Sequence, residues 1–289
     1  MFEKYLLDFN LSNWKDCLDQ AKYFIDENGF FIAKNILDKD ILTSIRKYVS
    51  NFIFHLRKKN GMSISTIKED ENFDEGFKEL CNKDRKFGGI IYRACRRITP
   101  LHQLSCNEKL LKLSSHIIAS SYLISSNLKA IRIDHPNENT YLFDLHQDYP
   151  YIQDSFNALV YWIPLKTVSL KEGALKIYCG SHKGGLKKVK VRDADNINQN
   201  GAHTIELANK YVNEGYEALL IPMEFGNCLV FSTLLLHEST KNVSENCRWT
   251  LQVRHGDFNH PEAIARNWPG GMIEGDSFEK YHPEYVTEA

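Results

Sequence analysis

The segment from Arg248 to Arg254 constrains the fold more than any other part of the sequence. Along an extended chain its residues alternate, so the polar side chains share one face and the apolar side chains share the other. A barrel strand with inward-pointing polar residues is expected where the interior is a reaction cavity and not a packed core. We therefore expect a closed, barrel-like β fold around a cavity. The polar face carries Arg248, Thr250, Gln252 and Arg254, and the apolar face carries Trp249, Leu251 and Val253.

Other short apolar runs, separated by Asn, Gly, Pro and Asp, predict further strands. Their lengths suit strands better than helices, and most of them lie in the second half of the chain. The predicted strands are 29–33, 128–134, 140–146, 156–163, 174–179, 218–221, 227–232 and 247–256.

Helical spacing dominates the first part of the chain. A helix is predicted over 14–27 with a stop at Asn28-Gly29, and Asn107 is predicted to cap another helix. Asp38 is predicted to cap a long helix that lies against a sheet on one apolar stripe. The stripe consists of Ile41, Ile45, Tyr48, Val49, Phe52 and Leu56.

Helices first and many short strands afterwards favour a mainly β fold, an antiparallel jelly roll of cupin-like shape buttressed by N-terminal helices. We expect one domain over 1–289, since no linker or repeat marks a boundary. Within it, 1–120 forms the helical buttress with loops, including 60–90, that border the pocket. Residues 121–258 form the jelly-roll core, and 259–289 form a C-terminal tail.

Composition narrows the class of partner. The 36 basic and 37 acidic residues nearly cancel, so no net charge points toward nucleic acid or a membrane surface, and a small molecule is the expected partner. The seven cysteines lack CxxC spacing, which argues against a disulfide framework or a structural zinc site. No apolar run approaches the roughly 20 residues that a membrane span needs, and the N-terminus lacks a secretory apolar core. A cytoplasmic protein of unknown oligomeric state is expected.

Three side chains form a candidate metal site. His146 and Asp148 are two residues apart at the end of a predicted strand, where alternation places them on one face. His237 follows the apolar strand around 227–232. Two imidazoles and one carboxylate leave open positions on an octahedral ion, which is the arrangement of non-haem Fe(II) oxygenases. The alternative is that this His-x-Asp triplet binds no metal and has arisen by chance in a chain with 11 histidines.

Arg248 lies eleven residues after His237, on the polar face of its strand. A fixed guanidinium there is suited to hold the distal carboxylate of 2-oxoglutarate in a two-pronged ion pair. Ser239 is placed to donate a hydroxyl to the same carboxylate. The alternative interpretation is that Arg248 forms a surface ion pair. The occurrence of His146, Asp148, His237 and Arg248 in this order, each beside a predicted strand, is harder to explain without a shared site.

At this point the chain resembles the phytanoyl-CoA dioxygenase family over nearly its whole length. The likeness is carried by ENGFFIAKNILDKDIL, LHQDYPY, YWIPLKTVSLKEGALKIYCGSHKGG and EFGNCLVFSTLLLHESTKNVSENCRWTLQVRH. Two positions depart from the family pattern. Cys179 stands where a proline is common, and Asn227 stands where an aspartate is common. Neither departure touches a metal ligand.

The resemblance implies a double-stranded β-helix and an oxygenase that uses Fe(II), 2-oxoglutarate and O2. It implies His146, Asp148 and His237 as iron ligands and catalytic residues, with Arg248 and Ser239 binding 2-oxoglutarate. It also places Trp162 in the pocket and Arg132 as a contact to co-substrate or substrate, whereas His182 in the Gly-Ser-His segment has a structural role. Phe143 is either an aromatic wall of the pocket or a plain core residue.

The sequence thus predicts a non-haem Fe(II)- and 2-oxoglutarate-dependent dioxygenase, most simply a hydroxylase acting on a small molecule or natural product. Asp148 favours oxidation over halogenation, because related halogenases lack this carboxylate. Two alternatives stay open, namely a cupin-like metalloenzyme without 2-oxoglutarate and a catalytically silent binding protein on the same fold. Substrate identity is not determined by the sequence.

Overall fold

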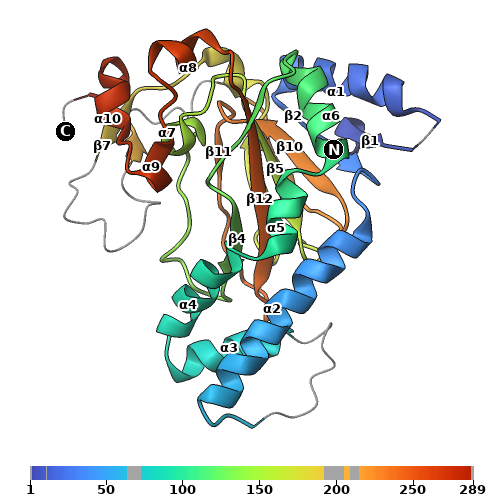
Figure 1. The fold of residues 1–289 in the computed structure, drawn as a ribbon, viewed down its shortest axis with the longest axis vertical. Coiled ribbons are helices and arrows are strands. Elements are labelled where there is room, and N and C mark those ends of the chain that lie inside the picture. Colours follow the sequence, from blue (N-terminus) through green and yellow to red (C-terminus); the bar gives the residue numbers. More distant parts are fainter. Residues whose placement is uncertain (1, 11, 64–72, 192–204, 209–214, 288–289) are drawn as a thin grey trace.

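The computed structural model describes residues 2–10, 12–63, 73–191, 205–208 and 215–287, and Figure 1 shows its arrangement. Its centre is a seven-stranded sheet in which all neighbours are antiparallel except β1 and β2. Both β3 and β4 pair with β12, along different parts of that long strand. The strands in sheet order are β1 (Leu6–Asp8), β2 (Phe30–Lys34), β10 (Cys228–Ser232), β5 (Leu159–Pro164), β12 (Arg248–Asp257) and β3 (Leu123–Ser125), with β4 (Ala130–Asp134) beside β12.

A second, three-stranded antiparallel sheet consists of β11 (His237–Glu238), β6 (Leu175–Tyr178) and β9 (Ala218–Ile221). Its apolar side chains share a core with the seven-stranded sheet, where Trp162 and Phe231 meet Leu175 and Ile177. Two antiparallel sheets packed face to face are the predicted double-sheet arrangement. A separate pair, β7 (Val189–Val191) and β8 (Ile205–Leu207), lies near the C-terminal helices.

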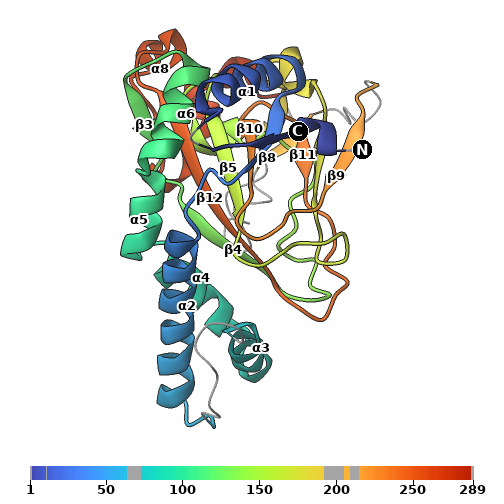
Figure 2. The same cartoon turned by 90° about the vertical axis from the view of Figure 1, so that its right-hand side faces the viewer.

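The opposite face of the seven-stranded sheet is covered by helices. Alternation along β5 sends Leu159, Tyr161 and Ile163 into this second core, while Val160 and Trp162 face the smaller sheet. Figure 2 shows α5 and α6 along one side of the strands, with α2 continuing below them. The N-terminal helices are α1 (Trp14–Asn28), α2 (Lys39–Lys59), α3 (Phe73–Lys83), α4 (Lys86–Cys95), α5 (Thr99–Ser105) and α6 (Glu108–Ile118).

Short helices complete the described chain. They are α7 (Tyr149–Ile152), α8 (Pro261–Ala265), α9 (Gly271–Glu274) and α10 (Phe278–Tyr281), together with 3-10 turns at Glu3–Tyr5, Ser181–Gly184 and Pro283–Tyr285. None of the described helices is long and apolar enough to cross a membrane.

Most predicted elements are confirmed at nearly their predicted bounds. Helix α1 ends at Gly29, which adopts a left-handed φ of 83° and donates its N–H to the carbonyls of Phe24 and Ile25. The side chain of Asn107 caps α6 by accepting from two backbone N–H groups. The segment 60–90, predicted as loop and short helix, contains α3 and the start of α4, while 64–72 lie outside the described residues.

One prediction of local structure is wrong, and a second is confirmed only in part. Residues 140–146 form no strand, because the segment makes only scattered backbone contacts with the chain around β11, namely the isolated bridge between His146 and His237 and a hydrogen bond from the Ser239 N–H to the Phe143 carbonyl.

Most of the predicted stripe of α2 is confirmed, because Ile45 and Val49 are buried and the side chains of Ile41, Phe52 and Leu56 pack against the core. The buried face of the helix is nevertheless turned slightly from the predicted one. It includes Leu42, Val49 and Ile53, whereas Tyr48 is 48% exposed. The reason is that the main neighbours of α2 are the helices α3, α4 and α5, so these helices set its buried face.

Candidate metal centre

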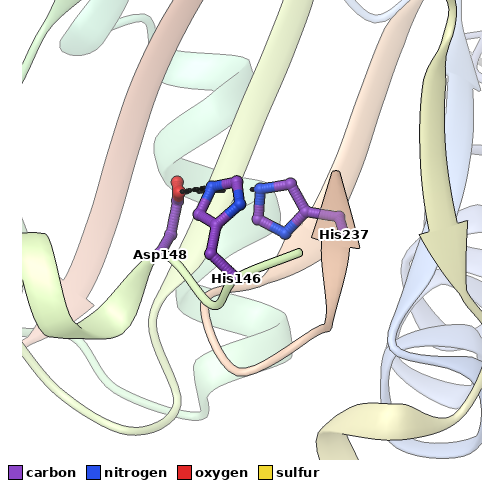
Figure 3. Close-up of side chains that lie close together, drawn as sticks. All are labelled: His146, Asp148 and His237. Carbon is purple, nitrogen blue, oxygen red and sulfur yellow. Dashed lines mark ion pairs between the residues drawn. The ribbon is translucent and has the colours of Figure 1, made fainter. Parts of the chain in front are cut away.

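Three segments bring the predicted ligands together (Figure 3). His146 and His237 exchange backbone hydrogen bonds, each N–H donating to the other's carbonyl at 3.0 Å, so the loop before α7 is fixed to β11. Asp148 follows as the N-cap residue, immediately before α7. The alternation argument for His146 and Asp148 was wrong because they do not lie on a strand, but the two side chains do converge with His237.

The donor atoms face one another at short range. Asp148 Oδ1 lies 3.5 Å from His146 Nε2 and 3.6 Å from His237 Nε2, and all three candidate ligand atoms lie within 4.8 Å of one another. The Nδ1 atoms are 2.7 Å and 2.9 Å from the carbonyls of Asp144 and Leu235. A carbonyl can only accept, so each Nδ1 carries the proton and each Nε2 presents a lone pair.

This arrangement fits a divalent cation. Two imidazole lone pairs and a carboxylate oxygen that point at one another repel unless a positive charge lies between them. The side chains of His146, Asp148 and His237 are only 12%, 9% and 5% exposed, so water screens that repulsion poorly. The set of two nitrogens and one oxygen is that of non-haem Fe(II) centres.

The electrostatic surroundings keep His146 and Asp148 in the protonation states that metal binding requires. Burial, together with the proximity of the His237 ring, lowers the pKa of His146 to about 4, so its imidazole is neutral near pH 7. Burial alone would raise the pKa of Asp148, but the positive charge of Arg254, together with hydrogen bonds from His146 and His237, outweighs burial and holds the pKa well below its usual range. Asp148 is therefore an anion.

The three residues line a cavity of about 490 Å³ that also receives Arg132, Trp162, Ser239 and Arg248. The predicted inward face of β12 is confirmed, since Arg248, Gln252 and Arg254 line this cavity while Trp249, Leu251 and Val253 are buried in the helical core.

Arg248 has an internal partner that the sequence reasoning missed. Its Nε and Nη2 lie 3.1 Å and 2.8 Å from Asp134 Oδ2, and its Nη1 donates to the carbonyl of Gly173. Arg132 donates to the same carboxylate and to the carbonyl of Tyr141. The sequence contained a signal for this contact, because Asp134 is two residues after Arg132 and therefore lies on the same face of β4.

The remaining predicted residues are placed as follows. Ser239 Oγ accepts the N–H of Phe143, and the Phe143 ring lies 4.9 Å from that of His146, so Phe143 is a wall of the cavity. Trp162 is 1% exposed on β5. His182 is remote from the metal ligands, since its Nε2 lies 3.2 Å from the carbonyl of Asp26 beside the end of α1.

Comparison with known proteins agrees with this geometry. The sequence profile of the family described as phytanoyl-CoA dioxygenase matches residues 25–250. The chain is 24% identical over 252 residues to the peroxisomal phytanoyl-CoA dioxygenase of Bos taurus, covering 84% of this chain and 69% of that protein. It is 31% identical over 109 residues to the 1-deoxypentalenic acid 11-beta-hydroxylase of Streptomyces exfoliatus, covering 38% of each.

Among solved structures, the epimerase SnoN in complex with Fe3+, alpha ketoglutarate and nogalamycin RO superposes with a TM-score of 0.53 at 14% identity. The superposition covers 87% of this chain and 89% of that one. This likeness confirms the predicted jelly-roll fold. Because the family profile spans more than half of the sequence and the metal ligands converge, the chain belongs to the phytanoyl-CoA dioxygenase family of iron- and 2-oxoglutarate-dependent oxygenases.

Proposed function

We propose that this dioxygenase hydroxylates a small-molecule or natural-product substrate while converting 2-oxoglutarate and O2 into succinate and CO2. One atom of O2 enters the substrate as a hydroxyl group and the other enters succinate. The observation that carries the proposal is that the three metal ligands and the guanidinium of Arg248 line one cavity.

His146, Asp148 and His237 would hold Fe(II), which when bound supplies the activation of O2 and the oxidation of a C–H bond. Three protein ligands leave other positions of an octahedral ion for the co-substrate. The backbone bridge between His146 and His237 fixes the two imidazoles before any ion arrives, so little reorganisation is needed on binding.

Arg248 and Arg132 would attract the distal carboxylate of 2-oxoglutarate. Two guanidinium groups share one carboxylate, that of Asp134, and the cluster therefore keeps one net positive charge. A guanidinium has five N–H donors, and the protein contacts of Arg248 leave donors for a further anion. Ser239 keeps its hydroxyl proton for donation, since its oxygen serves as the acceptor toward Phe143.

The other residues that line the cavity indicate what kind of substrate it can bind. Aromatic rings line it on the side of the metal ligands and of α4, including Tyr92, Tyr141, Phe143 and Tyr151. Arg93 of α4 also lines the cavity and is exposed, with no ion pair or hydrogen bond to another described residue. These features favour a substrate with an apolar or aromatic body and an anionic group.

The test is anaerobic titration of the Fe(II)-loaded protein with 2-oxoglutarate, followed by measurement of succinate after O2 is admitted. We expect a visible charge-transfer absorption on 2-oxoglutarate binding and succinate release that increases when a true substrate is added. A protein that binds Fe(II) but never 2-oxoglutarate contradicts the proposal and supports a metalloenzyme of another kind.

Arg248→Met sharpens this test. Because hydrogen bonds to charged groups contribute about 1.5–3 kcal/mol, we expect 2-oxoglutarate affinity to fall roughly 10- to 100-fold while Fe(II) affinity is largely retained. Arg266→Met is the matched control, since that guanidinium pairs with Glu262 and Glu284, which do not line the cavity. Equal losses of metal and co-substrate affinity in Arg248→Met would indicate misfolding.

A further inference from the structure

Arg254 is the last inward-facing arginine of β12, and its guanidinium is bound to the carboxylate ligand. Its Nε and Nη2 both donate to Asp148 Oδ2, at 2.9 Å and 2.8 Å. The other carboxylate oxygen, Oδ1, is the one that faces the two imidazoles. The structure therefore gives the two oxygens of Asp148 separate partners.

Arg254 is itself held firmly. Its Nη1 donates to the carbonyl of Leu128 at 2.8 Å and its Nη2 donates to Gln252 Oε1 at 2.9 Å. The side chain is 4% exposed. With the metal ligand, these contacts come from three parts of the chain: β12, the segment before β4 and the N-cap of α7. Contacts in several directions fix the guanidinium, so it can act as a rigid support.

Asp148 needs such a support for a local reason. It lies at the start of the four-residue helix α7 and makes no capping hydrogen bond there, so its backbone does not orient its carboxyl group. The terminal torsion of an aspartate is broad, and a free carboxylate can turn to bind a cation through both oxygens. Two donors on Oδ2 oppose that rotation and compete with a second bond from the metal.

We propose that Arg254 is a positioning residue that makes Asp148 a ligand through Oδ1 alone, which keeps an additional coordination position open. The inference rests on the proposed iron site. Coordination through both oxygens would occupy a position that 2-oxoglutarate or O2 needs. Arg254 thus acts through Asp148 and without touching the reacting groups.

The test uses metal alone, so it does not depend on turnover. Arg254→Met and Arg254→Lys are prepared metal-free, and their folding is compared with the wild type by circular dichroism. Fe(II) affinity is measured anaerobically by competition with a chelator, and Co(II) is added as a spectroscopic probe whose visible spectrum reports coordination number and geometry. Arg266→Met is again the control for removal of a guanidinium.

We expect Fe(II) affinity to fall about 10- to 100-fold in folded Arg254→Met, the usual effect of losing a group that orients a metal ligand. The Co(II) spectrum should change at the same time. Arg254→Lys should partly restore the Fe(II) affinity and the wild-type Co(II) spectrum, because lysine supplies a positively charged donor but not the two parallel N–H donors of a guanidinium. If Arg254→Met does not fold, Arg254→Lys decides the question through the same two measurements.

Unchanged metal affinity and an unchanged Co(II) spectrum in the folded variants would overturn the inference about Arg254 and leave the proposed function intact. A wild type that binds metal but not 2-oxoglutarate would overturn the proposed function, while the Co(II) comparison would still decide the role of Arg254. A wild type that binds no metal would overturn both.

Discussion

Arg248 on β12 and Asp134 on β4 form a buried ion pair, in which Nη2 lies 2.8 Å from Oδ2 and the two side chains are 1% and 3% exposed. Antiparallel pairing places the two residues directly opposite one another in the sheet. The cavity side of this sheet thus carries its own carboxylate beside the guanidinium that is proposed to bind the co-substrate.

Asp134 is predicted to stabilise the fold against acid. Burial would raise its pKa, but the charges of Arg132 and Arg248 outweigh that effect and lower the pKa to about 2. Because the pKa is about 3.9 in an unfolded chain, the stabilisation is fully present above about pH 4 and is lost as pH falls toward about 2. Urea unfolding over this range should show a smaller acid-induced loss in Asp134→Asn than in the wild type.

Near pH 7 the same substitution should be strongly destabilising. Asp134→Asn leaves two buried guanidinium groups without an anion, which costs about 3–5 kcal/mol of unfolding free energy. Asp40→Asn, at an exposed position of α2, is the control and should change stability little. A loss as small as that of the control would mean that the ion pair does not persist in solution.

Asp154 is predicted to have the opposite pH dependence. Burial raises its pKa to about 7, and its Oδ2 has no hydrogen-bond partner among the described residues. Since the folded pKa lies above the unfolded value, stability is highest below about pH 4 and declines as pH rises to about 7. Asp154→Asn removes this titration.

The free energy of unfolding of Asp154→Asn, relative to that of the wild type, should therefore increase by about 2 kcal/mol from about pH 5.5 to about pH 8. Chemical unfolding of both proteins at the two pH values measures it. The Ser126 hydroxyl and the nearby charges of Arg254 and Lys129 favour ionisation of Asp154, but burial outweighs them and the pKa is still raised. An advantage that shrinks with pH would show that Asp154 is already ionised through other contacts.

Asn107 should contribute to stability as a helix cap. Its Oδ1 accepts from the N–H groups of Lys109 and Leu110, at 3.0 Å and 3.4 Å. Asn107→Ala is expected to cost about 0.5–2 kcal/mol in urea unfolding. Asp38→Ala is a matched control, because Asp38 has the same position before α2 but forms only an exposed ion pair with Lys109, worth about 0–1 kcal/mol. Equal losses would show that the cap is not the cause.

Asp74 on α3 should fasten the helical layer to β12. Its carboxylate accepts from Trp249 Nε1 at 2.9 Å and from the N–H of Cys247 at 3.1 Å, and it is 2% exposed. Asp74→Ala leaves both donors unsatisfied in the core, at a cost of about 2–4 kcal/mol. Asp74→Asn keeps an acceptor and should cost less.

The neighbouring Glu75 provides the control for Asp74. Its carboxylate is 58% exposed and, among the described residues, pairs with Lys78 on the same helix, so Glu75→Ala should cost less than about 0.5 kcal/mol. Thermal unfolding of the three variants under one condition checks the order. A stability of Asp74→Ala equal to that of Glu75→Ala would contradict the proposed link.

Sequence reasoning succeeded where structure is local. The two faces of β12, the stop of α1 at Gly29 and the cap at Asn107 follow from short-range periodicity and backbone chemistry, and each is present in the structure. It failed for 140–146 and, within α2, for the burial of Tyr48. In both cases the burial or pairing of a segment depends on which distant element lies against it.

The candidate site divides in the same way. The sequence predicted His146, Asp148, His237 and Arg248 as site residues, because their types and their order in the chain are suited to binding a metal cation and a dicarboxylic acid. The convergence of the three ligands was expected for the wrong reason, since a backbone bridge to β11 and the N-cap of α7 produce it, and not strand alternation.

The sequence by itself determined the strand periodicity, the helix ends and the set of residues able to bind iron and a carboxylate, since these properties depend on side chains close together in the chain. Only the tertiary structure decided that Asp134 neutralises Arg248 and that Arg254 grips Asp148. Those pairs join residues 114 and 106 positions apart. Their formation depends on strand register and on how a loop is anchored, and a buried charge takes whichever opposite charge the folded backbone brings within reach.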